Sequence, residues 1–225
     1  MVVLSLGGSI ISPDNVDAPF LSAFRGLLTS YIDEFEEQIV IVTGGGAPAR
    51  RYQAAFREIV PDGSDEDQDW IGVAATRLNA ALVKAILGSY CQDPIVTDPT
   101  EPEGIAGMVL VASGWKPGFS TDYDAVVLAE RLGARLIVNL SNTAGIYDSD
   151  PRSNADAKPI ERLSWDELQE LVGSEWIPGR NVPFDPVATK AAAKLGAPLV
   201  AAAGRDLENL RAILTGEPFE GTLVT

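Results

Sequence analysis

Short apolar runs alternate along this chain with longer segments in which apolar residues recur at helical spacing. Five runs are short, continuous and apolar, which is typical of strands covered on both faces of a sheet; they span Val2–Leu6, Ile39–Thr43, Met108–Ala112, Leu136–Leu140 and Leu199–Ala203. Helical spacing predicts helices over Phe20–Phe35, Trp70–Leu87, Ala125–Leu132, Ala188–Leu195 and Leu207–Leu214. The alternation favours right-handed β–α–β crossovers. It therefore predicts an α/β fold around a mostly parallel sheet.

Two polar segments between these elements are expected to be exposed loops. Pro61–Asp69 is strongly acidic, and Cys91–Gly104 combines prolines with acids. Ser164 followed by Glu167 fits a capping box that opens a further helix. No segment has the composition of a linker, so we expect the 225 residues to form a single domain. Within it, one lobe is expected over about residues 1–140 and another over about residues 141–225.

Two of the predicted strands run directly into glycine-rich turns. Gly7-Gly8-Ser9 follows the first strand, and Gly44-Gly45-Gly46 follows the second, with Arg50 and Arg51 just beyond. Glycine lets backbone N–H groups approach an anion without a Cβ in the way, and a helix N-terminus adds partial positive charge. Ligands of open α/β sheets bind at the carboxyl ends of the strands. The pair of turns therefore predicts a site for two phosphate-bearing ligands.

The net charge of −15 limits the partners of this chain. Such acidity argues against binding to nucleic acid or to an anionic membrane surface. Lysine is scarce, which leaves two interpretations open: adaptation to a saline cytosol, or an ordinary acidic protein. Histidine is absent from the sequence, which excludes a Ser-His-Asp triad, a Cys-His pair and any mechanism that needs an imidazole base.

The sequence also bears on location. No apolar run approaches the roughly 18 residues of a membrane span, and no basic segment precedes a long apolar stretch near the N-terminus, so a cytoplasmic location is expected. Cys91 is the single cysteine. It is expected to be a buried or half-buried free thiol, as is typical of a reducing compartment.

Two common nucleotide-binding signatures, GxxxxGK[ST] and a GxGxxG after the first strand, are absent from the sequence. Four other clusters accompany the glycine turns. They lie at residues 69–80, which begin Asp-Trp-Ile-Gly; at 114–122, Gly-Trp-Lys-Pro-Gly-Phe-Ser-Thr-Asp; at 141–151, Ser-Asn-Thr-Ala-Gly-Ile-Tyr-Asp-Ser-Asp-Pro; and at 185–190, Asp-Pro-Val-Ala-Thr-Lys. In this order and spacing, the clusters resemble the amino acid kinase family, and within it the uridylate kinases of the archaeal type.

The resemblance covers nearly the whole chain and implies both a fold and an activity. The fold is a three-layer α/β/α sandwich, and the activity is transfer of the γ-phosphate of ATP to UMP with Mg²⁺ in pyrimidine nucleotide synthesis. Homo-oligomers, commonly hexamers, are also implied. ATP would be bound by Ser5, Leu6, Gly7, Gly8, Ser9, Gly46, Arg50, Ser141, Asn142, Tyr147 and Asp150. UMP would be bound by Gly45, Asp69, Trp115, Lys116, Pro117, Gly118, Phe119, Ser120 and Thr121. No metal ligands are assigned.

Three of these side chains are candidates for the transfer step, which needs two anions held in line with their charge offset. Arg50 has a planar fork that matches phosphate. Lys190, near the start of a helix, could reach the transferring phosphate, and Asp122 could lie near Mg²⁺ or orient the acceptor. Simpler interpretations compete: a surface charge for Arg50 or Lys190, a helix cap for Asp69 and a core position for Tyr147.

Four positions depart from the usual family sequence. Ser5 stands where many members carry a lysine, Ala144 replaces the aspartate of NVDG, and Phe119 and Ser120 replace the histidine and first threonine of PGHTTD. Two alternatives therefore stay open. One is a family member that acts on another small phosphate or carboxylate acceptor. The other is a catalytically weak nucleotide-binding storage or regulatory protein on the same fold. An isopentenyl phosphate kinase would need a histidine, and an aspartate kinase would need room for regulatory domains.

Overall fold

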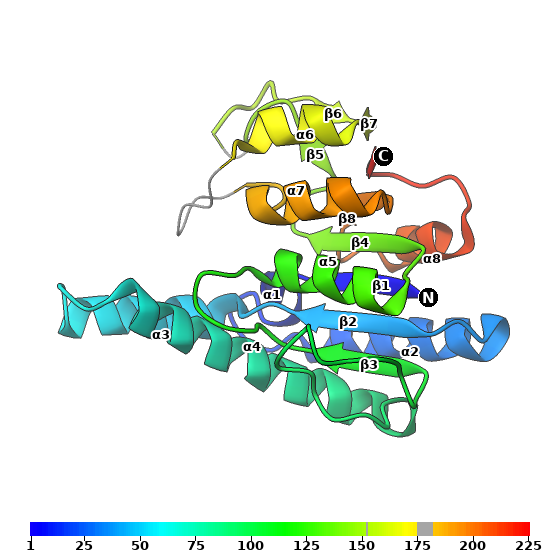
Figure 1. Ribbon diagram of the computed structural model, residues 1–225, viewed down its shortest axis with the longest axis horizontal. Coiled ribbons are helices and arrows are strands. Elements are labelled where there is room, and N and C mark those ends of the chain that lie inside the picture. Colours follow the sequence, from blue (N-terminus) through cyan, green and yellow to red (C-terminus); the bar gives the residue numbers. More distant parts are fainter. Residues whose placement is uncertain (152, 175–181) are drawn as a thin grey trace.

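The molecule is built around a seven-stranded sheet in the order β3-β2-β1-β4-β8-β9-β7, seen in a computed structural model that describes residues 1–151, 153–174 and 182–225 (Figure 1). The strands of this sheet are β1 (Val2–Leu6), β2 (Ile39–Thr43), β3 (Val109–Ala112), β4 (Leu136–Ser141), β7 (Arg162–Leu163), β8 (Leu199–Ala203) and β9 (Thr222–Val224). β1 pairs in parallel with both β2 and β4, β2 pairs in parallel with β3, and β4 pairs in parallel with β8. β9 runs antiparallel to β8. A separate hairpin joins β5 (Ile146–Tyr147) to β6 (Pro159–Ile160). The five predicted strands and the mostly parallel sheet are confirmed.

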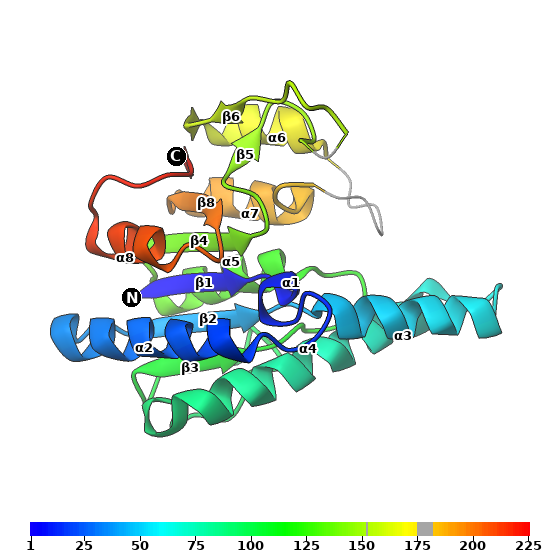
Figure 2. The same cartoon turned by 180° about the vertical axis from the view of Figure 1, so that it is seen from behind.

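Helices cover both faces of the sheet, which gives the three-layer sandwich (Figures 1 and 2). One face packs against α1 (Gly8–Ile11), α2 (Ala18–Phe35), α4 (Asp65–Leu87) and α8 (Leu207–Thr215). The other face packs against α5 (Thr121–Leu132), α6 (Trp165–Val172) and α7 (Pro186–Leu195). Because side chains alternate along a strand, Leu4 of β1 lies in the first core cluster and Val3 in the second. A central sheet buried on both faces explains why its strands are continuously apolar in sequence.

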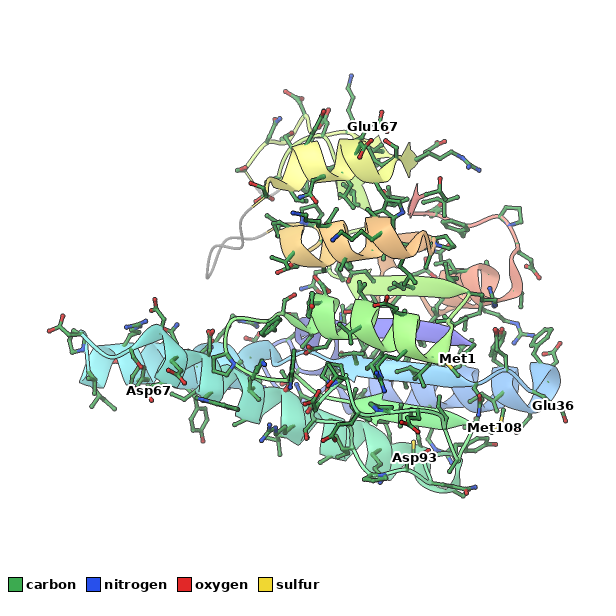
Figure 3. The ribbon with its side chains drawn as sticks, in the orientation of Figure 1. Met1, Glu36, Asp67, Asp93, Met108 and Glu167 are labelled. Carbon is green, nitrogen blue, oxygen red and sulfur yellow. The ribbon has the colours of Figure 1, made fainter. Side chains whose placement is uncertain are left out.

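Helices α3 (Gly46–Ile59) and α4 pack along each other and project as a hairpin beyond the sheet, with Asp67 at its outer end (Figure 3). The prediction of an exposed loop over Pro61–Asp69 is wrong in its second half. Ser64 caps α4 by accepting a hydrogen bond from the Asp67 backbone N–H at 3.0 Å. The acids at 65–67 form the first helical turn, where negative charge is favoured by the helix dipole.

Helix α3 is absent from the elements predicted above, for a physical reason. It buries only Ala47 and Ala49 among its residues and is rich in polar side chains, so it does not stand out as a segment of the core. The same holds for β5, β6, β7 and β9, which are too short to leave a pattern. The Cys91–Gly104 segment is a loop that follows the short turn η1 (Gly88–Tyr90), interrupted only by a bridge from Val96 to Ala112.

Helix α4 with its following turn is long and apolar enough by composition to cross a membrane. The same composition is typical of the core helix of a soluble protein. Val73, Ala80, Val83 and Leu87 are buried on the inner face of α4, which contacts β2 and β3. These contacts account for its apolar character without a membrane.

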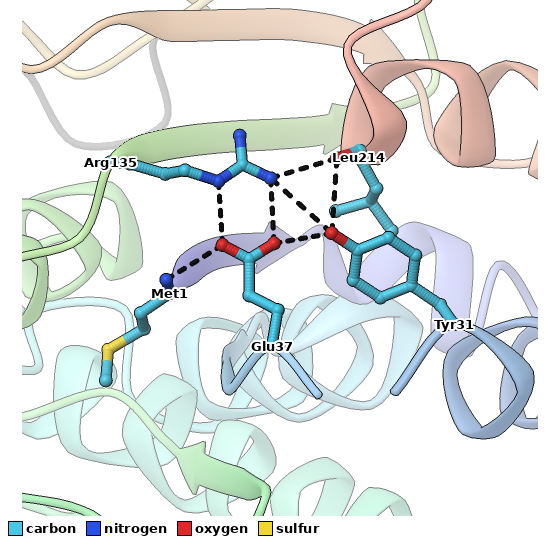
Figure 4. A network of polar contacts seen from close by, with 5 residues as sticks. All are labelled: Met1, Tyr31, Glu37, Arg135 and Leu214. Atoms are coloured by element: carbon cyan, nitrogen blue, oxygen red, sulfur yellow. Dashed lines mark hydrogen bonds and ion pairs between the residues drawn. The ribbon is translucent and has the colours of Figure 1, made fainter. Parts of the chain in front are cut away.

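A polar network closes the end of the sheet opposite the glycine turns (Figure 4). The Glu37 carboxylate accepts hydrogen bonds from Arg135 Nε at 2.7 Å and Nη2 at 2.8 Å, from the N-terminal amine of Met1 at 2.8 Å and from the Tyr31 hydroxyl. Arg135 also donates to the Leu214 carbonyl at 2.9 Å. These charged bonds hold the pKa of Glu37 at about 2 despite its partial burial, and they connect the starts of β1 and β4 with the ends of α2 and α8.

Candidate functional site

The two glycine turns touch each other through their backbones. β1 and β4 are neighbours at the point where the strand order changes direction, and Gly7 N–H donates to the Leu140 carbonyl there at 3.0 Å. A Cβ on Gly8 would lie 2.1 Å from the backbone nitrogen of Gly46. Gly46 itself has φ +67, and its Cβ would lie 2.3 Å from the Gly8 carbonyl oxygen. Glycine is therefore required in both turns by close approach, and in the second also by its left-handed backbone.

Buried polar side chains from α4 and β2 hold the second turn in place. The Asn79 amide donates to the Gly44 carbonyl at 2.7 Å and to the Gly45 carbonyl at 3.2 Å. The Thr43 hydroxyl donates to the Thr76 carbonyl at 3.0 Å. Sequence reasoning assigned no role to Asn79 or to the Thr76 side chain. The sequence could indicate such a role, because both residues fall on the face of α4 that carries its buried apolar residues, and buried polar side chains need hydrogen-bond partners.

A cavity of about 550 Å³ opens beside the first turn. It is lined by seven of the residues expected at ATP: Gly7, Gly8, Ser9, Ser141, Asn142, Tyr147 and Asp150. Tyr147 is half-buried at the end of β5, so its ring is available to the cavity instead of being enclosed in the core. The other four residues of that prediction lie elsewhere. Ser5 and Leu6 are buried in β1, and Gly46 and Arg50 line the neighbouring cavity.

The neighbouring cavity is smaller, about 260 Å³, and lies beside the second turn. Five residues expected at UMP line it: Gly45, Asp69, Lys116, Phe119 and Thr121. Arg50 reaches it from α3, and its guanidinium donates to Ser9 Oγ and to the Pro13 carbonyl, each at 3.0 Å. Because Ser9 lines the larger cavity and Arg50 the smaller one, this contact joins the two spaces. The arrangement suits two anionic ligands that meet at the paired turns.

The loop over residues 114–120 forms one wall of the smaller cavity and is anchored at three backbone N–H groups. Gly114 N–H donates to Thr76 Oγ1 at 2.8 Å, Trp115 N–H to Asp124 Oδ2 at 3.1 Å, and Gly118 N–H to Asp69 Oδ2 at 3.0 Å. Ser120 ends the loop as the N-cap of α5. Asp69 is therefore a helix residue of α4 that binds the loop and lines the cavity, and not a helix cap.

Aromatic rings continue from this loop into α5. Trp115 and Phe119 have ring centroids 4.9 Å apart, and Phe119 and Tyr123 are 5.0 Å apart. Trp115, Pro117, Gly118 and Ser120 do not line the cavity. Of these, Trp115, Gly118 and Ser120 shape the loop that presents the lining residues. The sequence groups these residues in one segment, but it does not distinguish those that line the cavity from those that support the loop.

Three aspartates gather behind the two cavities. Asp122 accepts hydrogen bonds from Ser5 Oγ at 3.1 Å and from the Asp185 backbone N–H at 3.3 Å. Burial of its carboxyl, together with the charge of Asp185, raises the pKa of Asp122 to about 6. Burial likewise raises the pKa of Asp124 to about 7; its Oδ1 has no partner among the described residues. Asp185 caps α7 by accepting from Val187 and Ala188 N–H at 2.7 Å.

Lys190, the third candidate for the transfer step, lies apart from this constellation. It is exposed on α7 and lines neither cavity in the described part of the chain. Ser5 stands at the position of the usual family lysine, and its hydroxyl donates a hydrogen bond to the Asp122 carboxylate. Of the three candidates, the structure therefore brings only Arg50 to a cavity wall, whereas Asp122 contacts Ser5 and Asp185 and is not among the described lining residues.

A third hollow, of about 710 Å³, lies around the Glu37 network at the far end of the sheet. It is the largest of the three but also the shallowest, and its Arg135 is already paired with Glu37. The paired turns, with their glycine backbones and an arginine that makes no ion pair with the described residues, fit a phosphate ligand better.

Comparison with known proteins decides the family. Residues 1–201 match the model of the amino acid kinase family. This chain belongs to the amino acid kinase family. A uridylate kinase of Methanospirillum hungatei is 39% identical over 227 residues, which cover 100% of this chain and 94% of the relative. One of Thermoplasma volcanium is 37% identical, with 96% and 94% covered.

Among solved structures, this amino acid kinase is similar to the crystal structure of a uridylate kinase from Archaeoglobus fulgidus. The TM-score is 0.84, the sequence identity is 33%, and the match covers 100% of this chain and 99% of the other. The three-layer fold implied by the resemblance is thereby confirmed.

Proposed function

We propose that this amino acid kinase transfers the γ-phosphate of ATP to UMP, giving ADP and UDP. The observation that carries the proposal is the backbone contact between the two glycine turns, with a larger cavity beside one and a smaller cavity beside the other. A nucleoside triphosphate and a monophosphate bound there would have their phosphates at the shared boundary. The uridylate kinases that match along nearly all of the chain support UMP as the acceptor. ATP as the donor is what the family resemblance implies.

In this proposal the chain acts by positioning and by charge, as phosphoryl transfer requires. Backbone N–H groups of Gly8 and Ser9 would face the donor phosphates, whereas the Gly7 N–H is bound to the Leu140 carbonyl and fixes the turn. Arg50 would offset negative charge at the boundary. Asp69 Oδ2 already accepts a hydrogen bond from the Gly118 N–H, so Asp69 Oδ1 would accept one from a ribose hydroxyl of the acceptor. Tyr147 would pack beside the donor base. Lys190 would take part only if the region around α7 approaches the phosphates.

Mg²⁺ belongs to this proposal as the partner of the donor phosphates. The described residues hold no group of three or more His, Cys, Asp or Glu side chains arranged for a metal. This fits Mg²⁺, which is usually bound by one or two carboxylates together with phosphates and water. Asp122 and Asp185 would be those carboxylates. Burial raises the pKa of Asp122, the charge of Asp185 adds to this effect, and a cation would offset that charge. When bound, the ion supplies charge neutralisation for the transferring group.

The decisive experiment incubates purified protein with ATP, Mg²⁺ and a panel of nucleoside monophosphates, and measures ADP together with each diphosphate product. UDP is the expected product, and chelation of the metal should abolish it. Absence of UDP under these conditions would overturn the proposal. Tight ATP binding without transfer to any acceptor would instead favour the storage or regulatory alternative that the Ser5 and Ala144 departures motivate. Transfer to another acceptor alone would favour a different substrate within the family.

An Arg50→Ala variant tests the placement of the phosphates. Arg50 is exposed and lies on α3 outside the core, so its loss should leave the melting temperature nearly unchanged. Nucleotide affinity should fall by roughly tenfold or more, because a hydrogen bond from a charged group is worth about 1.5–3 kcal/mol. Arg51, which is exposed beside it, provides the matched control as Arg51→Ala. Equal affinities in the two variants would contradict the placement.

We propose that the protein is a homo-oligomer, a hexamer by resemblance to its family, with copies meeting on the hairpin of α3 and α4. The exposed apolar side chains Tyr52 (72%), Ile59 (78%), Trp70 (43%) and Leu78 (64%) lie along this hairpin. Arg51 near the start of α3 and Glu58 near its end would pair across two antiparallel copies. Ile59→Asp should lower the molar mass measured by light scattering, whereas Val187→Asp on α7 should not. An unchanged mass in Ile59→Asp would refute this interface.

We propose further that the chain works in the cytoplasm as a single domain, with an acceptor-side lobe over about residues 1–140 and a donor-side lobe over about residues 141–225. The lining of the smaller cavity lies wholly in the first lobe, and most of the lining of the larger cavity lies in the second. Cooperative unfolding in a single calorimetric transition would support one domain, and two separable transitions would contradict it.

A further inference from the structure

A buried threonine of the main sheet is bound to the β5–β6 hairpin. Thr222, at the start of β9, has no exposed surface, and it is not among the described residues that line either nucleotide cavity. Its Oγ1 accepts a hydrogen bond from the Ile146 N–H at 2.8 Å and donates one to the Ile160 carbonyl. Ile146 and Ile160 face each other across the hairpin. One hydroxyl of the main sheet therefore holds both strands of the hairpin.

The peptide group between Gly145 and Ile146 is bound at both of its polar atoms by threonine hydroxyls. Thr143 Oγ1 donates to the Gly145 carbonyl at 3.0 Å, and Thr222 Oγ1 accepts from the Ile146 N–H. Because a peptide group is planar, bonds at its two ends set its orientation. Thr143, Gly145 and Tyr147 all line the larger cavity. The orientation of this one peptide therefore decides where that part of the cavity wall lies.

Two glycines allow the strands to come this close at the junction. A Cβ on Gly145 would lie 2.8 Å from Thr222 Oγ1 and 3.2 Å from the Thr222 backbone nitrogen. Gly221 has φ +152, and its Cβ would lie 2.6 Å from the Ala201 carbonyl oxygen of β8. Neither position has room for a side chain, so Thr222 is packed between β8 and β5. Its hydroxyl acts from a position that the sheet determines.

The contacts of Thr222 lead to the larger cavity and not to the smaller one. The described lining of the smaller cavity lies within residues 45–121, on other elements. Ile146 is fully buried, and a buried N–H costs free energy unless it is hydrogen-bonded. Without the Thr222 hydroxyl, the peptide would turn toward another acceptor and shift Gly145 and Tyr147. The donor side would be altered while the acceptor side stays as it is.

On this basis, which rests on the donor cavity of the proposed function, we propose that Thr222 is a positioning residue for the donor nucleotide. Through the peptide between Gly145 and Ile146, it sets the wall against which the donor base packs, without touching the nucleotide itself. The base is bound in the ground state and in the transition state alike. The effect of Thr222 therefore falls mainly on KM for ATP and only slightly on kcat.

The test measures binding of ATP with Mg²⁺ and of UMP by calorimetry, and KM for each, in the wild type, Thr222→Val and Thr222→Ser. Valine keeps the branched shape but removes the hydroxyl, whereas serine keeps the hydroxyl. We expect Thr222→Val to raise Kd and KM for ATP about tenfold and to change Kd for UMP less than about twofold. Thr222→Ser should stay within about threefold of the wild type for ATP.

Thr215→Val is the matched control, because the same chemical change removes a hydroxyl that donates to the Arg211 carbonyl within α8, at 2.9 Å. It should leave Kd for ATP unchanged. Binding is measured at a temperature where circular dichroism shows each variant to be folded, so that lost stability does not enter Kd. Thr143→Val removes the bond at the other end of the same peptide. It should also weaken ATP binding and spare UMP, and it carries the test if Thr222→Val does not fold.

Unchanged ATP affinity in folded Thr222→Val, or in Thr143→Val, would overturn the proposal. Equal losses for ATP and UMP would also overturn it, since they would mean that the hydroxyl supports the fold as a whole. A Thr222→Ser variant as weak as Thr222→Val would show that the hydroxyl is not the acting group. The proposed function fails by a different result: wild-type protein that binds ATP and UMP but forms no UDP. Binding and turnover therefore separate the two claims.

Discussion

Replacing Glu37 by glutamine should destabilise the protein in a manner that depends on pH. The pKa of this carboxyl is lowered from an ordinary value of 4.5 to about 2 by Arg135, the N-terminal amine and Tyr31. At 1.36 kcal/mol per pKa unit, this difference sets an upper limit of about 3 kcal/mol on its contribution to folding. Arg135 is nearly half-exposed, so solvent screening reduces the expected loss in Glu37→Gln to about 1–2 kcal/mol at pH 7.

The direction of the pH effect follows from the lowered pKa. A carboxylate stabilised in the folded state contributes its full stabilisation above the unfolded pKa of about 4.5 and loses it as the pH falls toward about 2. The difference in unfolding free energy between wild type and Glu37→Gln should therefore be constant from pH 7 to about pH 5. It should then shrink as the pH is lowered further. Urea unfolding followed by circular dichroism at pH 7, 5 and 3.5 measures it.

Glu34→Gln is the matched control, because the same chemical change removes one partner of an exposed ion pair with Arg211. Exposed pairs contribute about 0–1 kcal/mol. If Glu37→Gln is no more destabilising than Glu34→Gln at pH 7, the network does not act as described. A difference that stays constant down to pH 3.5 would equally refute the reasoning.

Three further outcomes are expected. Gly8→Ala should lower the unfolding free energy by about 1–3 kcal/mol in urea titrations and weaken ATP binding, because its Cβ would meet the backbone of the second turn; wild-type values for both would show that the turns can separate. Ser164→Ala should cost about 1 kcal/mol by the same assay, since it removes the capping box of α6, and a loss below a few tenths would contradict the box. Cys91 should react with a thiol reagent only slowly in the native protein and rapidly in urea, because burial raises the pKa of its thiol to about 11; equal rates would show that it is accessible.

The sequence was sufficient for the framework of the molecule and for the two glycine turns at the ends of neighbouring strands. Buried strands leave continuous apolar runs, and the glycine residues that follow β1 and β2 can be read directly from the sequence. Helix α3 leaves no such run, because only Ala47 and Ala49 are buried and its polar contacts with α4 come from Gln53 and Arg57. The polarity of residues 65–67 predicts a loop, but acids are also favoured in the first turn of a helix, where the structure has them.

Contacts between distant residues could not be predicted. Nothing local to Ser5 indicates that its hydroxyl binds Asp122, 117 residues away. Likewise, the dependence of the 114–120 loop on Thr76 and Asp124 appears only once α4 and α5 are packed on the sheet. Lys190 shows the converse, because position at a helix start indicated a role in transfer whereas the fold leaves the side chain on the surface.

The contact between the two glycine turns has a consequence for how such a protein can change. Since backbone atoms of Gly8 and Gly46 form the boundary between the cavities, the spacing between a donor and an acceptor held there is a property of the main chain. Substitutions in the 114–120 loop or around Tyr147 change the wall of one cavity or the other, but they leave this spacing alone. Under the proposed function, new acceptors would therefore arise through side chains at the rim, whereas a change in either turn would affect both ligands at once.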